Sequence, residues 1–308
     1  MRPRLLFIFL DGVGLAPPGT DNPFASVPMP ALTGQIGGRL VAGTVPRDGV
    51  LLRELDATLG VEGMPQSATG QTSLFTGGNA AAVLGFHQAA FPGGRLQRLL
   101  AEHSLFRRLS EEGLRCTFAN PLTRDPYGQT SGRLSATTRA MMAAGLPFRR
   151  LSDLARDEAV TWDVCRDRWT RSGGGWERIE APVAGRHLVG LAATHDVTLF
   201  ETFMTDLAGH GRWGWTAEEA LTRVDGLIAG ILGSADPGLT VLLTSDHGNV
   251  ESESTRLHTR NPVPLVVWGP GRDAFAECSS ILHVAPAVPG LFGLAQEEAS
   301  QSEASDLL

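Results

Sequence analysis

Lysine is missing from this chain of 308 residues, so its whole Lys+Arg total of 26 consists of arginine. Genomic base composition explains such a bias without any appeal to mechanism. The absence still has a chemical consequence, because any positive side chain that contacts an anion here must be an arginine or a protonated histidine. Arginine can bind phosphate or carboxylate through two parallel hydrogen bonds. Anion recognition by this protein is therefore expected to depend on arginine.

Three other scarcities exclude broad classes of protein. The three cysteines are widely spaced and odd in number, which favours buried thiols over a disulfide framework or a zinc finger. No apolar run reaches the ~18 residues needed to span a bilayer. The run Leu5–Leu10 ends at Asp11-Gly12, where a signal peptide would have small residues. A net charge of −7 argues against a nucleic-acid-binding surface.

These absences together predict a cytoplasmic protein that binds neither membrane nor nucleic acid. Its oligomeric state is left open by the sequence. With 42% hydrophobic residues, the chain can build a sizeable core.

Apolar strands alternate with helical segments over most of the chain, which predicts an α/β fold with a mostly parallel sheet and helices on both faces. The expected strands are 4–10, 114–118, 197–203, 239–244 and 264–268, and the expected helices are 67–77, 95–112, 187–194 and 216–232. The stretch 121–185 has a different character, with ten arginines against eight acidic residues and no aliphatic strand. We expect a core of 1–120 and 186–308 with 121–185 as a small inserted cap, whose start could lie as early as residue ~90.

Three carboxylates follow three of the expected strands. Asp11 follows the first strand, Asp206 follows 197–203, and Asp246 follows 239–244. In an open α/β sheet, ligands bind outside the carboxyl ends of the strands. Three histidines stand close to these carboxylates in the sequence, namely His210, His247 and His258. Carboxylates and imidazoles gathered at one edge predict a site for two divalent metal ions.

Ser67 is placed where the helix 67–77 is expected to begin. A serine at this position is most often only a helix cap. A helix N-terminus also attracts phosphate, so the hydroxyl can alternatively serve as a nucleophile toward phosphorus if a metal ion activates it. The residues around Ser67 do not by themselves decide between these two roles.

Five motifs resemble, in this order, those of the alkaline phosphatase superfamily, and most of all its cofactor-independent phosphoglycerate mutase and phosphopentomutase branch. The motifs are Asp11-Gly12-Val13-Gly14, the Ser67–Gly77 segment, Asp206-x-x-x-His210, Asp246-His247-Gly248-Asn249 and His258-Thr259-x-Asn261-Pro262-Val263-Pro264. They cover both halves of the expected core and not the cap. The resemblance implies an alkaline-phosphatase-like core.

The resemblance also implies a set of ligands and a nucleophile. One metal ion would be held by Asp11, Ser67, Asp246 and His247, and the other by Asp206, His210 and His258. Donors of this kind suit Mn²⁺, Zn²⁺ or Mg²⁺, and the related enzymes favour Mn²⁺ or Zn²⁺. Ser67 would attack a phosphoryl group and form a phosphoserine. Water would discharge this intermediate in a phosphatase, and a second substrate hydroxyl would do so in a mutase.

Several functions share this chemistry, and the sequence favours a phosphomonoesterase that acts on a small phosphorylated metabolite. The expected cap is shorter than that of the phosphoglycerate mutases, and no lysine is present to take the place of the mutases' active-site lysine. A phosphomutase is the alternative, followed by a phosphodiesterase or a non-catalytic binder of phosphorylated ligands. A sulfatase is excluded because position 71 is Gln instead of Arg. Candidates for substrate binding are His87, Arg124 and Arg133.

Overall fold

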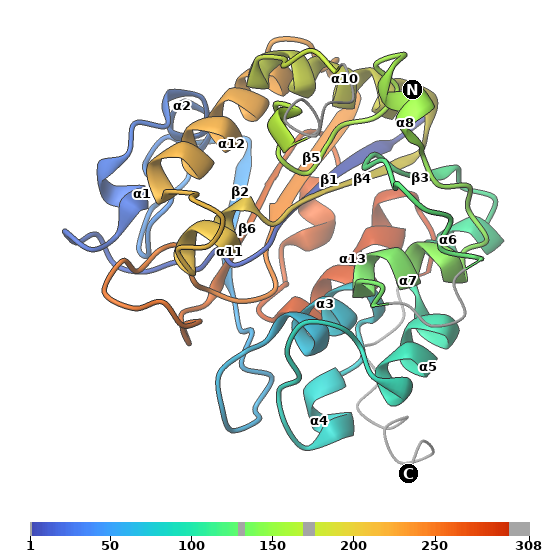
Figure 1. Cartoon of the computed structure of the whole chain (residues 1–308), viewed down its shortest axis with the longest axis horizontal. Helices are drawn as coiled ribbons and strands as arrows, with labels where there is room; N and C mark the ends of the chain where they lie inside the picture. Colours follow the sequence, from blue (N-terminus) through green and yellow to red (C-terminus); the bar gives the residue numbers. More distant parts are fainter. Residues whose placement is uncertain (1, 129–132, 169–175, 296–308) are drawn as a thin grey trace.

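In the computed structural model, a six-stranded sheet forms the centre of the molecule (Figure 1). The structure describes residues 2–128, 133–168 and 176–295. The strands lie in the order β2-β6-β5-β1-β4-β3. Their bounds are β1 Arg4–Leu10, β2 Val50–Leu55, β3 Cys116–Phe118, β4 Val197–Thr202, β5 Leu239–Thr244 and β6 Val263–Trp268. Among these six strands only β6 runs against the others, so the expected mostly parallel sheet is confirmed.

Strand β1 lies between β5 and β4 and is buried on both sides. Successive side chains of a strand point to opposite faces. Leu6 and Ile8 accordingly pack into one hydrophobic cluster, whereas Phe7 and Phe9 pack into the other. Such a continuous apolar run is typical of a parallel strand that is covered by helices on both faces.

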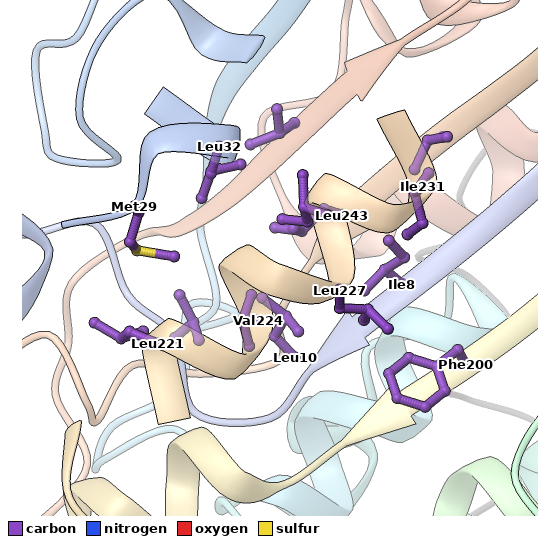
Figure 2. Packing of buried hydrophobic residues seen from close by; sticks show 14 of the residues in the cluster. Ile8, Leu10, Met29, Leu32, Phe200, Leu221, Val224, Leu227, Ile231 and Leu243 are labelled. Carbon is purple, nitrogen blue, oxygen red and sulfur yellow. The ribbon is translucent and has the colours of Figure 1, made fainter. Parts of the chain in front are cut away.

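Helices cover both faces of the sheet, as expected. The first face carries α1 Pro23–Ser26, α2 Pro30–Ile36, α10 Ala181–Thr194, α11 Met204–Gly209 and α12 Ala217–Leu232. Figure 2 shows Leu221, Val224, Leu227 and Ile231 of α12 lying over Ile8 and other strand residues. The second face carries α3 Ser67–Thr76, α5 Gly94–His103, α6 Leu105–Glu111, α7 Ala136–Ala143 and α13 Val284–Leu291. Three short segments complete this side, namely α4 Ala80–Leu84, η1 Arg272–Phe275 and η2 Ile281–His283.

The structure divides one expected helix and adds one strand that was not expected. The single helix predicted over 95–112 is divided into α5 and α6 at Ser104, whose φ of −56° and ψ of 127° leave the helical region. The Ser104 hydroxyl donates to the Ala140 carbonyl at 2.7 Å and caps α6 at the Arg107 N–H. A hydroxyl that bonds to nearby backbone competes with a continuous helix. The edge strand β2 was not predicted, because its VLLREL sequence is only half buried.

The segment 121–185 contributes α7 and α8, which spans Leu151–Leu154. Ala140 and Met141 of α7 belong to the hydrophobic cluster on the second face, and Val160 belongs to the cluster on the first face. The described part of this segment therefore packs against both faces of the sheet, and the boundary expected after residue 185 falls within α10. Its role as a cap that selects the substrate stays a prediction.

The described helices include none with the length and apolarity required for a transmembrane span.

Candidate metal centre

The carboxyl ends of β1, β4 and β5 meet at one edge of the sheet, because these strands are parallel neighbours. Asp11 directly follows β1, and Asp246 stands two residues after β5. Asp206 lies in the first turn of α11, which begins shortly after β4. Gly12 allows the close approach of two of these segments, since its φ is +71° and an added Cβ would lie 2.8 Å from the Asp206 side chain.

One group of donors surrounds the imidazole of His247. Its Nε2 atom lies 3.3 Å from Asp11 Oδ1 and 3.5 Å from Asp246 Oδ2. The Ser67 hydroxyl lies 3.0 Å from the same nitrogen. The ligand atoms of Asp11, Asp246 and His247 all fall within 4.8 Å of one another, which is close enough to share one cation.

The second group of donors is centred on Asp206. Its Oδ1 atom lies 3.4 Å from Nε2 of both His210 and His258, and these two nitrogens are 3.1 Å apart. The ring of His258 stacks on that of His247, with centroids 3.8 Å apart, so the two groups adjoin. The structure thus brings together the seven residues named from the sequence, and their role as ligands remains a proposal.

The three imidazoles are oriented by backbone carbonyls. Nδ1 of His258 faces the Pro65 carbonyl at 2.8 Å, and Nδ1 of His210 faces the Arg256 carbonyl at 2.6 Å. Nδ1 of His247 faces the Gly248 carbonyl at 3.4 Å. A carbonyl only accepts, so these contacts place a proton on Nδ1, and in a neutral ring they leave Nε2 with a lone pair directed into the site. Metal-binding histidines are commonly held in this way.

The carboxylates of the first group repel one another. Burial, followed by the charges of Asp246 and Asp206, raises the pKa of Asp11 well above its usual range. Burial and the charge of Asp206 raise the pKa of Asp246 to about 7. Asp11 Oδ1 and Asp246 Oδ2 are buried, and neither accepts a hydrogen bond within the described structure. Buried carboxylate oxygens in this state need a cation, so the residues present fit a divalent metal ion.

The second group is balanced differently. Burial opposes ionisation of Asp206, but the hydrogen bonds with His258 and Asn249, together with the neighbouring imidazoles, outweigh it and hold the pKa of Asp206 below its usual range. Burial lowers the pKa of His258, but the hydrogen bonds with Asp206 and the Pro65 carbonyl and the charges of Asp206 and Asp246 outweigh burial, so the pKa is raised overall. Burial and the neighbouring His258 lower the pKa of His247 to about 3, so this ring is neutral and able to ligate a metal ion at physiological pH.

Ser67 is the first residue of α3, and Gln66 occupies the N-cap position. The Ser67 hydroxyl therefore does not cap the helix, which was the alternative left open by the sequence. The ten-residue helix directs its N-terminus, where negative charge is favoured, at the donors. Gly70 permits this approach, because a Cβ there would lie 2.7 Å from the Asp246 carbonyl oxygen.

Glu251 is a buried supporting residue that the sequence analysis missed. One carboxylate oxygen accepts from the Gly14 N–H at 2.9 Å and the Asn249 N–H at 2.7 Å. The other accepts from the Asn261 amide at 3.0 Å and from the Thr259 hydroxyl. Glu251 thus ties together three of the loops that carry the site. The sequence gives little indication that Glu251 is buried, because a glutamate in a loop rich in serine and glutamate resembles a solvated surface residue.

Glu201 is a second residue that was missed. It lies near the end of β4, and burial raises its pKa to about 7. Its charge is among those that raise the pKa of Asp11. A glutamate within an apolar strand is visible in the sequence, but only the pairing of β4 with β1 shows that it lies near the carboxylates.

The three candidates for substrate binding lie at different depths. His87 is partly buried, and its Nε2 faces the Val61 carbonyl at 3.3 Å. The backbone of its neighbour Gln88 accepts from the Thr69 N–H at 3.3 Å, so this loop borders the start of α3. Arg124 and Arg133 are exposed. Their contact with a substrate stays a prediction.

Comparisons with known proteins agree with this geometry. A family model described as the metalloenzyme superfamily matches residues 186–296, which include Asp206, His210, Asp246, His247 and His258. The chain also superposes on an alkaline phosphatase from the Antarctic bacterium TAB5 with a TM-score of 0.58, over 95% of this chain and 99% of that one, at 14% identity. The resemblance to the alkaline phosphatase superfamily is confirmed.

Curated relatives of this chain carry the names of two mutases. A phosphopentomutase of Methylobacterium nodulans is 27% identical over 289 residues, covering 86% of this chain and 67% of the relative. A 2,3-bisphosphoglycerate-independent phosphoglycerate mutase of Prochlorococcus marinus is 33% identical over 124 residues, covering 29% of this chain and 23% of the relative. The match to a second phosphopentomutase, from Methylobacterium radiotolerans, covers only 51% of the length of that relative. The comparisons support a metal-dependent enzyme of phosphoryl transfer.

Proposed function

We propose that this chain uses two divalent metal ions to transfer the phosphoryl group of a small metabolite in the cytoplasm, through a phosphoserine at Ser67. The observation that carries the proposal is the position of the Ser67 hydroxyl, 3.0 Å from Nε2 of His247 within a cluster of buried carboxylates. A hydroxyl at a helix N-terminus beside such a cluster suits attack on phosphorus.

The donors fall into two sets. Asp11, Asp246 and His247, together with Ser67, would hold one ion, and Asp206, His210 and His258 would hold the other. The ions would supply positive charge that lowers the pKa of the serine hydroxyl and offsets the charge of the phosphoryl oxygens. Oxygen and imidazole donors without thiolate suit Mn²⁺ or Zn²⁺, with Mg²⁺ also compatible.

The residues of the chain define the order of bond changes. The Ser67 hydroxyl gives up its proton, and Oγ forms a bond to phosphorus while the bond from phosphorus to the leaving oxygen breaks and that oxygen takes up a proton. The helix N-terminus of α3 favours the negative phosphoryl group that this step leaves on the serine. In a hydrolase, water then attacks the phosphoserine and releases inorganic phosphate. In a mutase, a second hydroxyl of the retained substrate attacks instead.

A phosphomonoesterase is the first candidate. No lysine exists to help retain an intermediate, and the segment expected to form the cap is short and packs against both faces of the sheet. The names of the curated relatives favour the second candidate, a phosphomutase. Two further candidates are compatible with the same cluster of residues. A phosphodiesterase would turn over diesters, and a non-catalytic binder of phosphorylated ligands would show no turnover.

Turnover assays test the proposal directly. Protein stripped with a chelator should be inactive toward p-nitrophenyl phosphate, and added Mn²⁺ or Zn²⁺ should restore activity. Preference for the bis-ester would instead indicate a phosphodiesterase. If neither ester is turned over, the same protein is assayed on pentose phosphates and phosphoglycerate. Failure on all of these substrates with metal bound would contradict an enzymatic role.

A further inference from the structure

A hollow of about 480 Å³ lies beside the C-terminal half of α10. Pockets that bind small ligands commonly have volumes of about 300–1,000 Å³. Its lining includes Arg149, Arg186, His187, Gly190 and His195. Arg186 and Gly190 are four residues apart, so they lie on the same face of the helix. The hollow is therefore large enough for a small metabolite, and polar groups line it.

Two arginines, Arg149 and Arg186, and two carboxylates, Asp157 and Glu158, line this hollow, and the carboxylates are paired with other arginines. Asp157 pairs with Arg166 at 2.7 Å, and Glu158 pairs with Arg156 at 3.0 Å. Within the described part of the chain, Arg149 and Arg186 form no ion pair with a carboxylate. Arg149 instead donates to the Glu158 carbonyl at 2.6 Å and to a threonine hydroxyl. Neither guanidinium forms a salt bridge with these carboxylates, although the charges of Asp153 and Glu158 do act on Arg149.

The two histidines of the lining, His187 and His195, both have lowered pKa values, so the positive charge comes from the arginines. Burial lowers the pKa of His187, and the charges of Arg166 and Arg186 act in the same direction, whereas the charge of Asp157, 3.8 Å from the ring, opposes them only in part. Burial also lowers the pKa of His195, whose Nδ1 lies 2.9 Å from the Leu191 carbonyl. Neutral imidazoles can donate or accept a hydrogen bond without adding charge. Such a lining matches the oxygens of a phosphate or carboxylate group.

We infer that this hollow is a second binding site, separate from the metal centre, for a small anion that carries a phosphate or carboxylate group. Arg186 and Arg149 supply the charge, His187 and His195 supply neutral hydrogen-bonding groups, and Gly190 leaves the space open. An added Cβ at Gly190 would meet no atom within 4 Å. The inference depends on this lining alone and not on the proposed phosphoryl transfer.

The hollow is remote from the metal centre. His195 stands two residues before β4, and Asp206 stands four residues after its end. Strand β4 spans six residues, or about 20 Å at 3.3 Å per residue. Figure 1 shows α10 leading into one end of β4 and α11 following the other. A ligand here would therefore not touch the metal ligands.

Titration calorimetry on the metal-loaded protein tests the inference, with sulfate as a phosphate mimic and malonate as a dicarboxylate, each against chloride at equal ionic strength. Arg186→Gln should weaken binding of the preferred probe about ten-fold or more, because a charge-assisted hydrogen bond is lost. Gly190→Leu should abolish binding by filling the hollow. This variant should fold, since leucine favours helix more than glycine does and its Cβ would meet no atom within 4 Å.

Arg98→Gln is the matched control, because Arg98 is an exposed arginine on α5, far from the hollow in the fold. Its affinity should equal that of the wild type. Stronger binding of sulfate than malonate would assign a phosphorylated ligand, and the reverse would assign a carboxylate. The inference is overturned if both probes behave like chloride. It is equally overturned if Gly190→Leu and Arg186→Gln bind as the wild type does, since the anion would then lie elsewhere, as at the metal centre.

Discussion

The hydroxyl oxygen of Ser67 and Nε2 of His247 lie 3.0 Å apart, although 180 residues separate them in the sequence. The same nitrogen is also the meeting point of Asp11 and Asp246. This contact joins the N-terminus of α3 to the loop that follows β5. It places a potential nucleophile directly against the donors of the proposed metal centre.

Replacing Ser67 with alanine should remove activity and leave the fold intact. Its hydroxyl does not cap α3, so the loss should be one of chemistry. We expect kcat for a phosphomonoester to fall on the order of 10³-fold or more, as for other nucleophile deletions. Steady-state kinetics and a thermal unfolding scan measure the two properties separately. Near-normal kcat in Ser67→Ala would point to direct attack by water.

Metal affinity should weaken as the pH falls. The pKa of Asp246 is raised to about 7, and that of His258 is also raised. When the pH falls below the pKa of either group, a proton occupies its ligand atom, so a metal ion must displace that proton. We expect tighter binding of Mn²⁺ or Zn²⁺ at about pH 8 than at about pH 6, with net release of protons. Calorimetry in two buffers of different ionisation enthalpy checks the release, and an equal affinity at both pH values would contradict it.

Glu251→Gln should destabilise the protein, because each carboxylate oxygen accepts two hydrogen bonds. In the variant, the amide NH₂ group of glutamine would replace one of these oxygens and would point at two hydrogen-bond donors, so both of their hydrogen bonds would be lost. We expect a loss of about 1–3 kcal/mol in the free energy of unfolding, measured by urea denaturation. Glu253→Gln is the matched control, since Glu253 is exposed. Equal losses in both variants would mean that Glu251 does not hold the loops together.

Arg124 and Arg133 test the role of the expected cap. If either guanidinium binds the substrate, its replacement by alanine should lower kcat/KM for candidate sugar phosphates more than for p-nitrophenyl phosphate. The stability of the protein should not change, because both residues are exposed. Kinetics with a panel of phosphomonoesters gives the comparison. Wild-type values for every substrate in both variants would identify them as ordinary surface residues.

The sheet and the gathering of the seven site residues at one edge could be predicted from the sequence, because both depend on short, local patterns, while the role of these residues as metal donors stays a prediction. Leu5–Leu10 is a continuous apolar run that is followed directly by Asp11, so the same short segment predicts both the strand and the position of the carboxylate. The approach of Asp206 to Asp11 could be inferred because parallel strands end at one edge.

The remaining features depend on contacts between distant segments. Glu251 looks like a solvated residue until the loops of Gly14 and Thr259 fold around it. The break at Ser104 depends on the Ala140 carbonyl, which comes from another helix. The half-exposed strand β2 is specified by its pairing with β6 and not by a strong pattern of its own.

The central claim is that Ser67 carries the phosphoryl group during turnover. Metal-loaded protein would be mixed with a phosphomonoester, quenched in acid within one turnover and digested, and its peptides analysed by mass spectrometry. The account predicts a phosphoryl adduct on the peptide that contains Ser67, and no adduct in Ser67→Ala. Rapid single-turnover release of phosphate by wild-type protein with no adduct at Ser67 at any quench time would contradict it.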